Sequence, residues 1–176
     1  MKTRTLFVSV AALVLLVPLM SCQRSQPQPA TTLTDEEVAA IGKTIDDALE
    51  AYAAKDLNRH MQYAAADVIF MEYDKRSQGV DELREKHVKP ELAEFTVTTY
   101  KAADRVVRGR GGLAYVSERN ILEMKDKAGN TFNTDSACAS YVFEKQPDGT
   151  WKLKQGHWSG PMNWSPKAPE QGAAKM

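Results

Sequence analysis

Residues 140–160, SYVFEKQPDGTWKLKQGHWSG, decide the fold, because they predict two strands joined by a tight turn. The turn lies at Pro147-Asp148-Gly149, and apolar residues alternate with polar ones after it. Working outward from this hairpin, further turn residues stand at Arg110-Gly111-Gly112 and Ala128-Gly129-Asn130. The sequence therefore predicts four successive strands that form an antiparallel sheet, at about 95–108, 113–125, 131–145 and 150–159.

The residues before this sheet predict helices. Thr34 and Glu37 have the spacing of a capping box, and a stripe of apolar residues at helical spacing follows as far as Tyr52. Asp56 is typical of the N-cap of a second, shorter helix. A strand at 68–73 follows, and then a helix over 80–88 that we expect Pro90 to end.

This order of elements predicts an α+β fold in residues 34–160. We expect a cone-shaped, strongly curved mixed or antiparallel sheet, wrapped around a long N-terminal helix and accompanied by two shorter helices. Such a sheet leaves a hollow whose mouth lies near the strand ends. Residues 161–176 contain three prolines and are expected to form a disordered tail.

The first 33 residues predict export rather than folding. Lys2 and Arg4 precede an apolar run that ends in Leu19-Met20-Ser21-Cys22, which resembles the lipobox of bacterial lipoproteins. The resemblance implies a signal peptide over 1–21, lipidation of Cys22 and a flexible tether over 22–33. An ordinary secretory signal is the alternative. The expected location is the cell envelope, lipid-anchored, on the outer membrane facing the periplasm in a Gram-negative host.

Charge and cysteine content exclude several classes of function. The chain has 23 basic and 23 acidic residues, and removal of the signal leaves a small acidic excess, which argues against a nucleic-acid partner. Cys138 then has no partner for an internal disulfide and is expected to be a buried small side chain. The sequence has no His-x-x-x-His, paired cysteine or Asp-rich loop, so we predict no metal and no cofactor.

Three segments in order resemble the nuclear-transport-factor-2-like superfamily, also called SnoaL-like. They are AYAAKDLNRHMQYAAADVIFME (51–72), GGLAYV (111–116) and the opening stretch (140–160). The last is similar to the association-domain branch of calcium/calmodulin-dependent kinase II, in which a DG-x-W strand ends in His-x-Ser-Gly. No His-Arg-Asp motif is present, so this resemblance implies a hub-like fold rather than phosphoryl transfer.

Glu72 and His157 are the candidate catalytic residues. Val68, Phe70 and Glu72 share one face of their strand, and Glu72 comes late, near the mouth of the hollow. The resemblance places Glu72 where ketosteroid-isomerase-like members carry their carboxylate base. Strict alternation from Trp151 puts His157 and Ser159 on the inner face of the last strand and Trp158 on the outer face. Ordinary structural roles, a solvated Glu72 and a His157 bonded to the backbone, stay open.

The expected pocket has Tyr52, Phe70, Tyr141 and Ser159 in its wall. In the family the catalytic tyrosine stands where this chain has Ala48, and Tyr52 lies one turn later on the same stripe. Three functions remain open: a membrane-anchored module that binds a small apolar or amphipathic molecule, an isomerase, dehydratase or hydrolase with Glu72 or His157 as general base, and an assembly domain. A homodimer through the sheet is expected.

Overall fold

The structure, a computed structural model, describes residues 32–161 and 163–165. Its helical segments are α1 (Asp35–Ala53), α2 (Leu57–Met61), α3 (Val80–Glu82), a π-helical segment (Leu83–Val88) and α4 (Lys89–Glu94). Its strands are β1 (Ala64–Glu72), β2 (Lys75–Gln78), β3 (Phe95–Arg110), β4 (Leu113–Asp126), β5 (Thr131–Lys145), β6 (Trp151–Ser159) and β7 (Asn163–Ser165). The four long strands are confirmed. The predicted signal peptide, Cys22 and all of the tether before Thr32 lie outside the described residues.

The predicted start of the long helix is confirmed in atomic detail. The Thr34 hydroxyl accepts from the backbone N–H of Glu37 at 3.3 Å, and the Glu37 carboxylate accepts from the backbone N–H of Thr34 at 3.0 Å. This capping box satisfies two backbone donors that a helix start leaves free. Asp56 caps α2 in the predicted way, because its carboxylate accepts from the backbone N–H of Arg59 at 3.0 Å.

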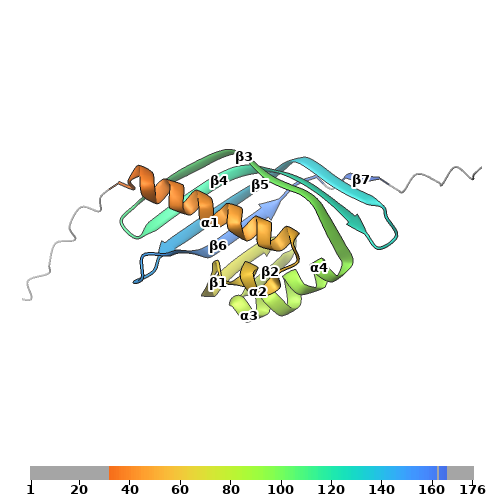
Figure 1. Cartoon of the computed structure of the whole chain (residues 1–176), viewed down its shortest axis with the longest axis horizontal. Coiled ribbons are helices and arrows are strands. Elements are labelled where there is room, and N and C mark those ends of the chain that lie inside the picture. Colours follow the sequence, from red (N-terminus) through yellow and green to blue (C-terminus); the bar gives the residue numbers. More distant parts are fainter. Residues whose placement is uncertain (1–31, 162, 166–176) are drawn as a thin grey trace, which may run out of the picture.

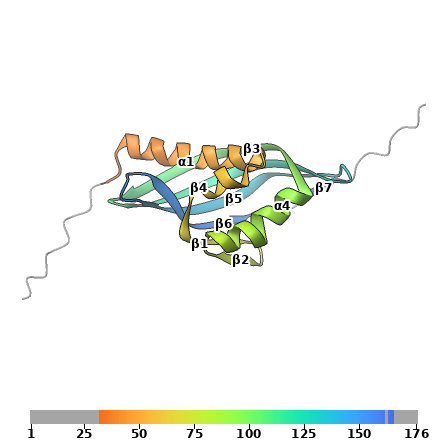
Figure 2. The same cartoon turned by 60° about the horizontal axis from the view of Figure 1, so that its bottom comes forward.

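The sheet is mixed, with the strand order β2-β1-β6-β5-β4-β3, and β7 pairs with β5. β1 and β6 run parallel, and all other pairs are antiparallel. The helix α1 runs along one face of the sheet, and α4 lies near the β1–β2 end (Figure 1). The turned view shows α1 above the strands (Figure 2). The predicted α+β architecture with a long N-terminal helix is confirmed.

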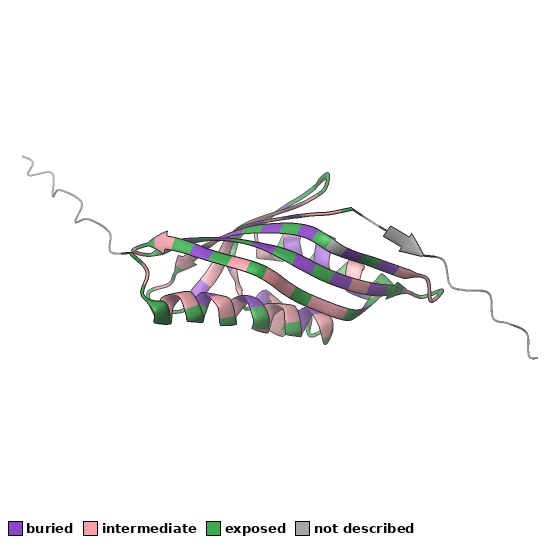
Figure 3. Ribbon diagram, turned by 90° about the horizontal axis from the view of Figure 1, so that it is seen from above, coloured by how far each residue is buried: buried purple, intermediate pink, exposed green. Residues whose placement is uncertain are grey.

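The core lies between α1 and the inner face of the sheet. Along β4, buried and exposed residues alternate, as the banding of the strands shows (Figure 3). The buried set of β4 includes Val116, Leu122 and Met124, and Ile41 and Ile45 of α1 are buried on the same core. Two polar residues, Glu118 and Asn120, stand in the same buried row. Among the described residues, no helix is long and apolar enough to cross a membrane.

Four local predictions are wrong. Helical structure does not end before Pro90 but continues as α4 to Glu94. The short strand β2 was not predicted, although it forms a two-residue hairpin with β1. Within the expected disordered tail, residues 163–165 pair with β5. Cys138 is exposed rather than buried, because the buried positions of that part of β5 are its neighbours Ala137 and Ala139.

Candidate functional site

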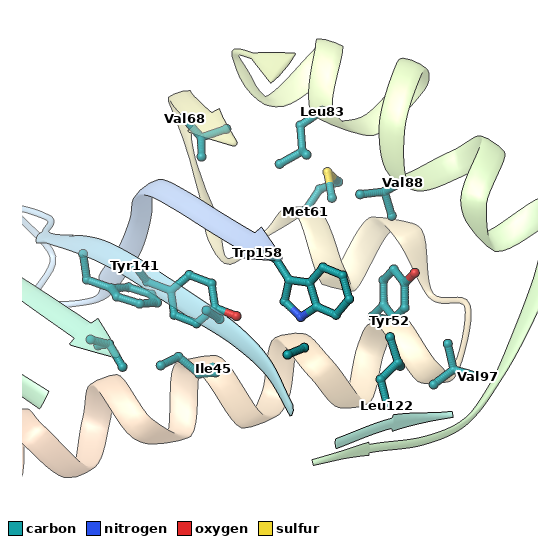
Figure 4. Close-up of a cluster of buried hydrophobic side chains, with 14 of the residues drawn as sticks. Ile45, Tyr52, Met61, Val68, Leu83, Val88, Val97, Leu122, Tyr141 and Trp158 are labelled. Carbon is teal, nitrogen blue, oxygen red and sulfur yellow. The ribbon is translucent and has the colours of Figure 1, made fainter. Parts of the chain in front are cut away.

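A cavity of about 620 Å³ lies between α1, the sheet and the helical stretch 80–94. Most of its wall is apolar, and Tyr52 and Trp158 stand within the buried cluster that lines it (Figure 4). Aromatic side chains come from almost every element around it: Tyr52, Tyr63, Phe70, Tyr73, Phe95, Tyr100, Phe132, Tyr141, Phe143 and Trp158. A cavity of this size and composition is typical of small-molecule sites.

One end of the cavity is polar and holds Glu72, His87 and Glu91. The Nε2 atom of His87 lies 2.5 Å from a carboxylate oxygen of Glu72. Ligating atoms of all three residues lie within 4.8 Å of one another. The His87 side chain is 5% exposed and that of Glu72 is 17% exposed, so their contact is shielded from water. We call these three residues the acidic cluster.

The backbone explains how the acidic cluster forms. Glu72 is the last residue of β1 and shares its inner face with Phe70. His87 and Glu91 are four residues apart in a continuous helical stretch, so their side chains meet on one side of it. The turn between them is wide, because the N–H of Lys89 donates to the carbonyl of Arg84, five residues back. Such a π-helical turn gives room to the ring of Pro90, which would crowd an ordinary α-helix.

Burial and charge repulsion act on Glu91. The pKa of Glu91 is raised from its ordinary value of 4.5 to about 7, chiefly by burial and then by the neighbouring Glu72 carboxylate, against the opposing effects of His87 and Tyr52. Burial also raises the pKa of Tyr52 well above its ordinary value. The Tyr52 hydroxyl therefore keeps its proton and donates it in a hydrogen bond to the Glu91 carboxylate. Glu91 can gain or lose a proton near neutral pH.

The hydrogen bonds of His87 indicate its tautomer. A proton on Nε2 allows the ring to donate to Glu72 at 2.5 Å. The other ring nitrogen, Nδ1, is buried and has no hydrogen-bond partner within the described part of the chain. The neutral ring with its proton on Nε2 is the form that leaves no donor unsatisfied, since Nδ1 is then a bare acceptor.

Several predicted site residues come together in this cavity. Glu72, Tyr52, Phe70 and Tyr141 all line it, as the sequence analysis predicted. Glu72 and Tyr52 both lie close enough to Glu91 to change the pKa of its carboxyl. The structure thus supports the placement of Glu72 at the mouth of an apolar hollow. A catalytic role for Glu72 stays a prediction.

The predicted placement of His157 and Ser159 is wrong. Neither residue lines the cavity, whereas Trp158, predicted to face outward, lines it and is 5% exposed. A β-bulge causes the reversal: Leu153 pairs with Phe143, and the next pair joins Gln155 to Val142, so β6 has one extra residue. The bulge exchanges the two faces of the strand for every residue after it.

Gly156 is part of the same reversal, because it takes an inner position beside Phe70. A Cβ atom at Gly156 would lie 2.5 Å from the Phe70 ring. The glycine therefore lets that ring lie flat against β6, next to Glu72. Phe70 in turn meets the His87 ring edge to face, with ring centroids 5.4 Å apart.

Two members of the acidic cluster, His87 and Glu91, were missed by the sequence analysis. Pro90 was expected to end the helix, which left Glu91 outside it and away from His87. Pro90 directly follows a π-helical turn, and no clear pattern in the sequence signals that the helix continues past it. One imidazole and two carboxylates also form a donor set that can bind a divalent cation. This set does not match any of the metal-binding motifs considered in the sequence.

Comparisons with known proteins agree with this geometry. A family model described as a SnoaL-like domain matches residues 41–163. The chain belongs to the SnoaL-like domain family. The match spans α1 to β7, and so includes every residue of the acidic cluster. A search of curated proteins gave no match.

Solved structures similar to this SnoaL-like chain share its nuclear-transport-factor-2-like fold at low sequence identity. A superfamily protein from Salmonella enterica is 19% identical, with a TM-score of 0.65 over 77% of this chain and 96% of its own. A ketosteroid isomerase-like protein from Erwinia carotovora is 20% identical, with a TM-score of 0.64 over 73% and 100%. A protein of unknown function in nutrient uptake from Rhodospirillum rubrum is 19% identical, with a TM-score of 0.58 over 69% and 98%. At these identities the likeness shows the fold alone.

Proposed function

We propose that this SnoaL-like domain binds a small, largely apolar molecule in the cavity, with the polar group of that molecule against the acidic cluster. The observation that carries the proposal is the asymmetry of the cavity. Its wall is mainly aromatic and aliphatic, and three of its polar side chains, those of Glu72, His87 and Glu91, meet at one place in it. Apolar walls supply affinity and a small polar group fixes orientation in sites of this type.

A neutral probe and a cavity-filling variant test the proposal. We expect 1-adamantanol to bind in isothermal titration calorimetry, and native mass spectrometry of protein from its host to reveal a co-purified small molecule. Ala48 lines the cavity, so Ala48→Trp should fill it and lower affinity for the probe at least tenfold. Ala39 is exposed on α1, and Ala39→Trp is the matched control that should bind as the wild type does. Binding unaffected by Ala48→Trp would rule the cavity out.

Proton transfer on the bound molecule is the second candidate function. The 2.5 Å contact between Glu72 and His87, and the pKa of about 7 at Glu91, favour it. In this proposal the Glu72 carboxylate takes a proton from carbon, and Glu91, which carries a proton over part of the neutral pH range, gives that proton to oxygen. The similarity to the ketosteroid isomerase-like protein supports only a shared fold and not a shared activity.

Exchange of a carbon-bound proton tests this second function without a known substrate. Wild-type protein should speed the exchange of the α-protons of 2-tetralone with D2O, followed by proton NMR. Glu72→Gln should lower that acceleration by about 100-fold or more, because it removes the base. Glu85→Gln is a matched control, since Glu85 is exposed on the same helical stretch and pairs with Lys89. Exchange no faster than in buffer would remove the enzyme proposal and leave the binding proposal intact.

We also propose that Cys22 attaches the domain to a membrane through lipid. The support is in the sequence: Lys2 and Arg4, an apolar run and the order Ser21-Cys22 have the arrangement of a lipoprotein signal. Cys22→Ala should move the protein from the membrane fraction to the soluble fraction, whereas Cys138→Ala should not. Retention of the Cys22→Ala protein in membranes would count against lipidation.

Assembly through the sheet is the remaining proposal, and it rests on the resemblance to the association-domain branch. Leu113 and Tyr115 expose more than half of their side chains on the outer face of β4. Exposed large apolar residues at one place favour contact with a partner. Analytical ultracentrifugation should show a dimer that Tyr115→Glu converts to a monomer. A monomeric wild type would end this proposal.

A further inference from the structure

The carboxylates of the acidic cluster lack a partner with a fixed positive charge. Within residues 32–161, Glu72 forms an ion-pair contact only with His87, and no lysine or arginine forms a salt bridge with Glu91. Two lysines, Lys75 and Lys86, line the cavity, and neither forms a salt bridge with the described residues of the acidic cluster. Lys86 pairs with Glu82 at 3.0 Å with 74% of its side chain exposed, and Lys75 is exposed on β2.

Two shielded carboxylates in one small volume favour a cation between them. Burying a charge is costly unless an opposite charge accompanies it, and among the described residues only the His87 imidazole pairs with either carboxylate. We propose that the molecule bound in the cavity is an organic amine, whose protonated nitrogen lies against the acidic cluster while its apolar skeleton fills the rest. This inference rests on the proposed binding function and names the class of its ligand.

The aromatic wall beside the cluster suits an ammonium group. Tyr52 stacks edge to face on Tyr100 with centroids 5.9 Å apart, and Tyr73 stacks in the same manner on Trp158 at 5.7 Å. All four line the cavity. Aromatic faces attract alkylammonium groups through cation–π interactions, and they do so more strongly where water is excluded. A carboxylate pair with aromatic walls thus recognises both the charge and the apolar part of an amine.

The ring of His87 favours an organic cation over a metal ion. A metal on Nε2 would require the ring proton on Nδ1, and metal-bound histidines normally donate that proton to a neighbouring acceptor. Nδ1 of His87 is buried without a partner among the described residues, so the metal-bound form would bury an unsatisfied donor. An ammonium ion instead leaves the existing hydrogen bond from Nε2 to Glu72 in place.

Protonation of Glu91 should weaken amine binding. The titratable groups that act on Glu91 come from four surrounding elements: Tyr52 of α1, Glu72 of β1, Lys75 of β2 and His87 of the π-helical segment. Tyr73, in the turn between β1 and β2, is coupled to it as well. As pH falls through about 7, Glu91 takes up a proton and the cluster loses one negative charge. Alkylamines stay protonated over this range, so the change in affinity reports the protein.

Three probes that share one skeleton test the inference: 1-aminoadamantane, 1-adamantanol and adamantane-1-carboxylate, which carry positive, zero and negative charge. We expect calorimetry at pH 8 to show the amine binding at least tenfold more tightly than the alcohol, and the carboxylate not binding. At pH 6 the amine should lose several-fold in affinity while the alcohol does not change. Glu91→Gln should remove the advantage of the amine and keep the affinity for the alcohol, and Glu85→Gln should change neither.

The outcomes distinguish the amine proposal from the more general proposal that the cavity binds an apolar molecule. Equal affinity for the amine and the alcohol, or tighter binding of the carboxylate, overturns the amine proposal and leaves the apolar-ligand proposal standing. Binding of none of the three probes overturns both. Addition of Zn²⁺ to the wild type supplies a last check. Zinc that binds stoichiometrically and displaces the amine, with both effects lost in Glu91→Gln, would assign the cluster to a metal and overturn the inference.

Discussion

Two buried polar clusters in this SnoaL-like domain differ in how their charges are compensated. Under the N-terminal half of α1, Glu118 is completely buried and accepts from the Nε atom of Arg105 at 2.7 Å and from the amide of Asn120 at 2.9 Å. Arg105 also donates to Asp46 at 2.7 Å and to the carbonyl of Gly42 at 3.0 Å. The acidic cluster has two carboxylates and only one imidazole.

The difference separates a structural role from a functional one. The Arg105 cluster joins α1 to β3 and β4, and a guanidinium with three acceptors leaves little for a ligand to add. The acidic cluster faces a cavity and carries a carboxyl whose pKa is raised to about 7. Titratable groups perturbed in this way gather at functional sites. Compensation of charge, rather than burial, distinguishes the two.

The largest expected effect comes from breaking the compensated cluster. Arg105→Leu should lower the free energy of unfolding by about 3–5 kcal/mol, because it leaves the Glu118 carboxylate buried without its cation. Urea denaturation monitored by circular dichroism measures the loss.

A surface pair gives the matched control for this variant. Arg119 pairs with Asp104 on the outside, where both side chains are more than half exposed. Arg119→Leu should therefore cost less than about 1 kcal/mol. Equal losses in the two arginine variants would show that the Arg105 cluster contributes no more than a surface contact, and the contrast between the clusters would fail.

A smaller effect of opposite sign is expected from the acidic cluster. The pKa of Glu91 is about 7 in the folded protein against an ordinary 4.5, so folding favours the protonated form. The stability of the wild type should therefore fall as pH rises from about 4.5 to 7 and then level off. Glu91→Gln removes this penalty and should be more stable than the wild type at pH 8, by up to about 3 kcal/mol.

Urea denaturation at pH 5, 6, 7 and 8 checks this sign. The gain from Glu91→Gln should be small at pH 5 and reach its full size by pH 8, while Glu85→Gln should show no such trend. A variant less stable than the wild type at pH 8 would mean that the protein compensates Glu91 as fully as it compensates Glu118.

One member of the acidic cluster, Glu72, could be predicted from strand alternation in the sequence. Glu72 was placed correctly because β1 alternates without interruption from Val68 to Glu72. The long strands were placed correctly because each hairpin carries glycine at its turn, and Gly111, Gly129 and Gly149 all adopt positive φ.

What the sequence could not predict depends on local irregularities without a clear pattern. The bulge in β6 places Trp158 rather than His157 in the cavity wall, and nothing in the alternating residues of this strand marks the extra position. Pro90 concealed Glu91, since only the wide turn before it allows the helix to continue. The partners of Arg105 also have no signal in the sequence, because its acceptor Asp46 is distant in sequence and its acceptor Glu118 lies on another strand.

The smallest expected effect isolates a single hydrogen bond of the acidic cluster. Tyr52 donates to the ionised form of Glu91 and so holds the pKa of that carboxyl below the value that burial alone would give. Tyr52→Phe should raise the pKa of Glu91 by less than about one unit, with little change in fold, because only the hydroxyl is lost. Carbon-13 NMR of protein labelled at glutamate side chains measures it, with the Glu91 signal assigned from its absence in Glu91→Gln. Tyr115→Phe is the control, since Tyr115 is exposed on β4 and does not line the cavity, and it should leave the Glu91 titration in place. A downward shift in Tyr52→Phe would show that the phenol stabilises the protonated carboxyl instead, and the cluster would then be less open to a cation than its geometry indicates.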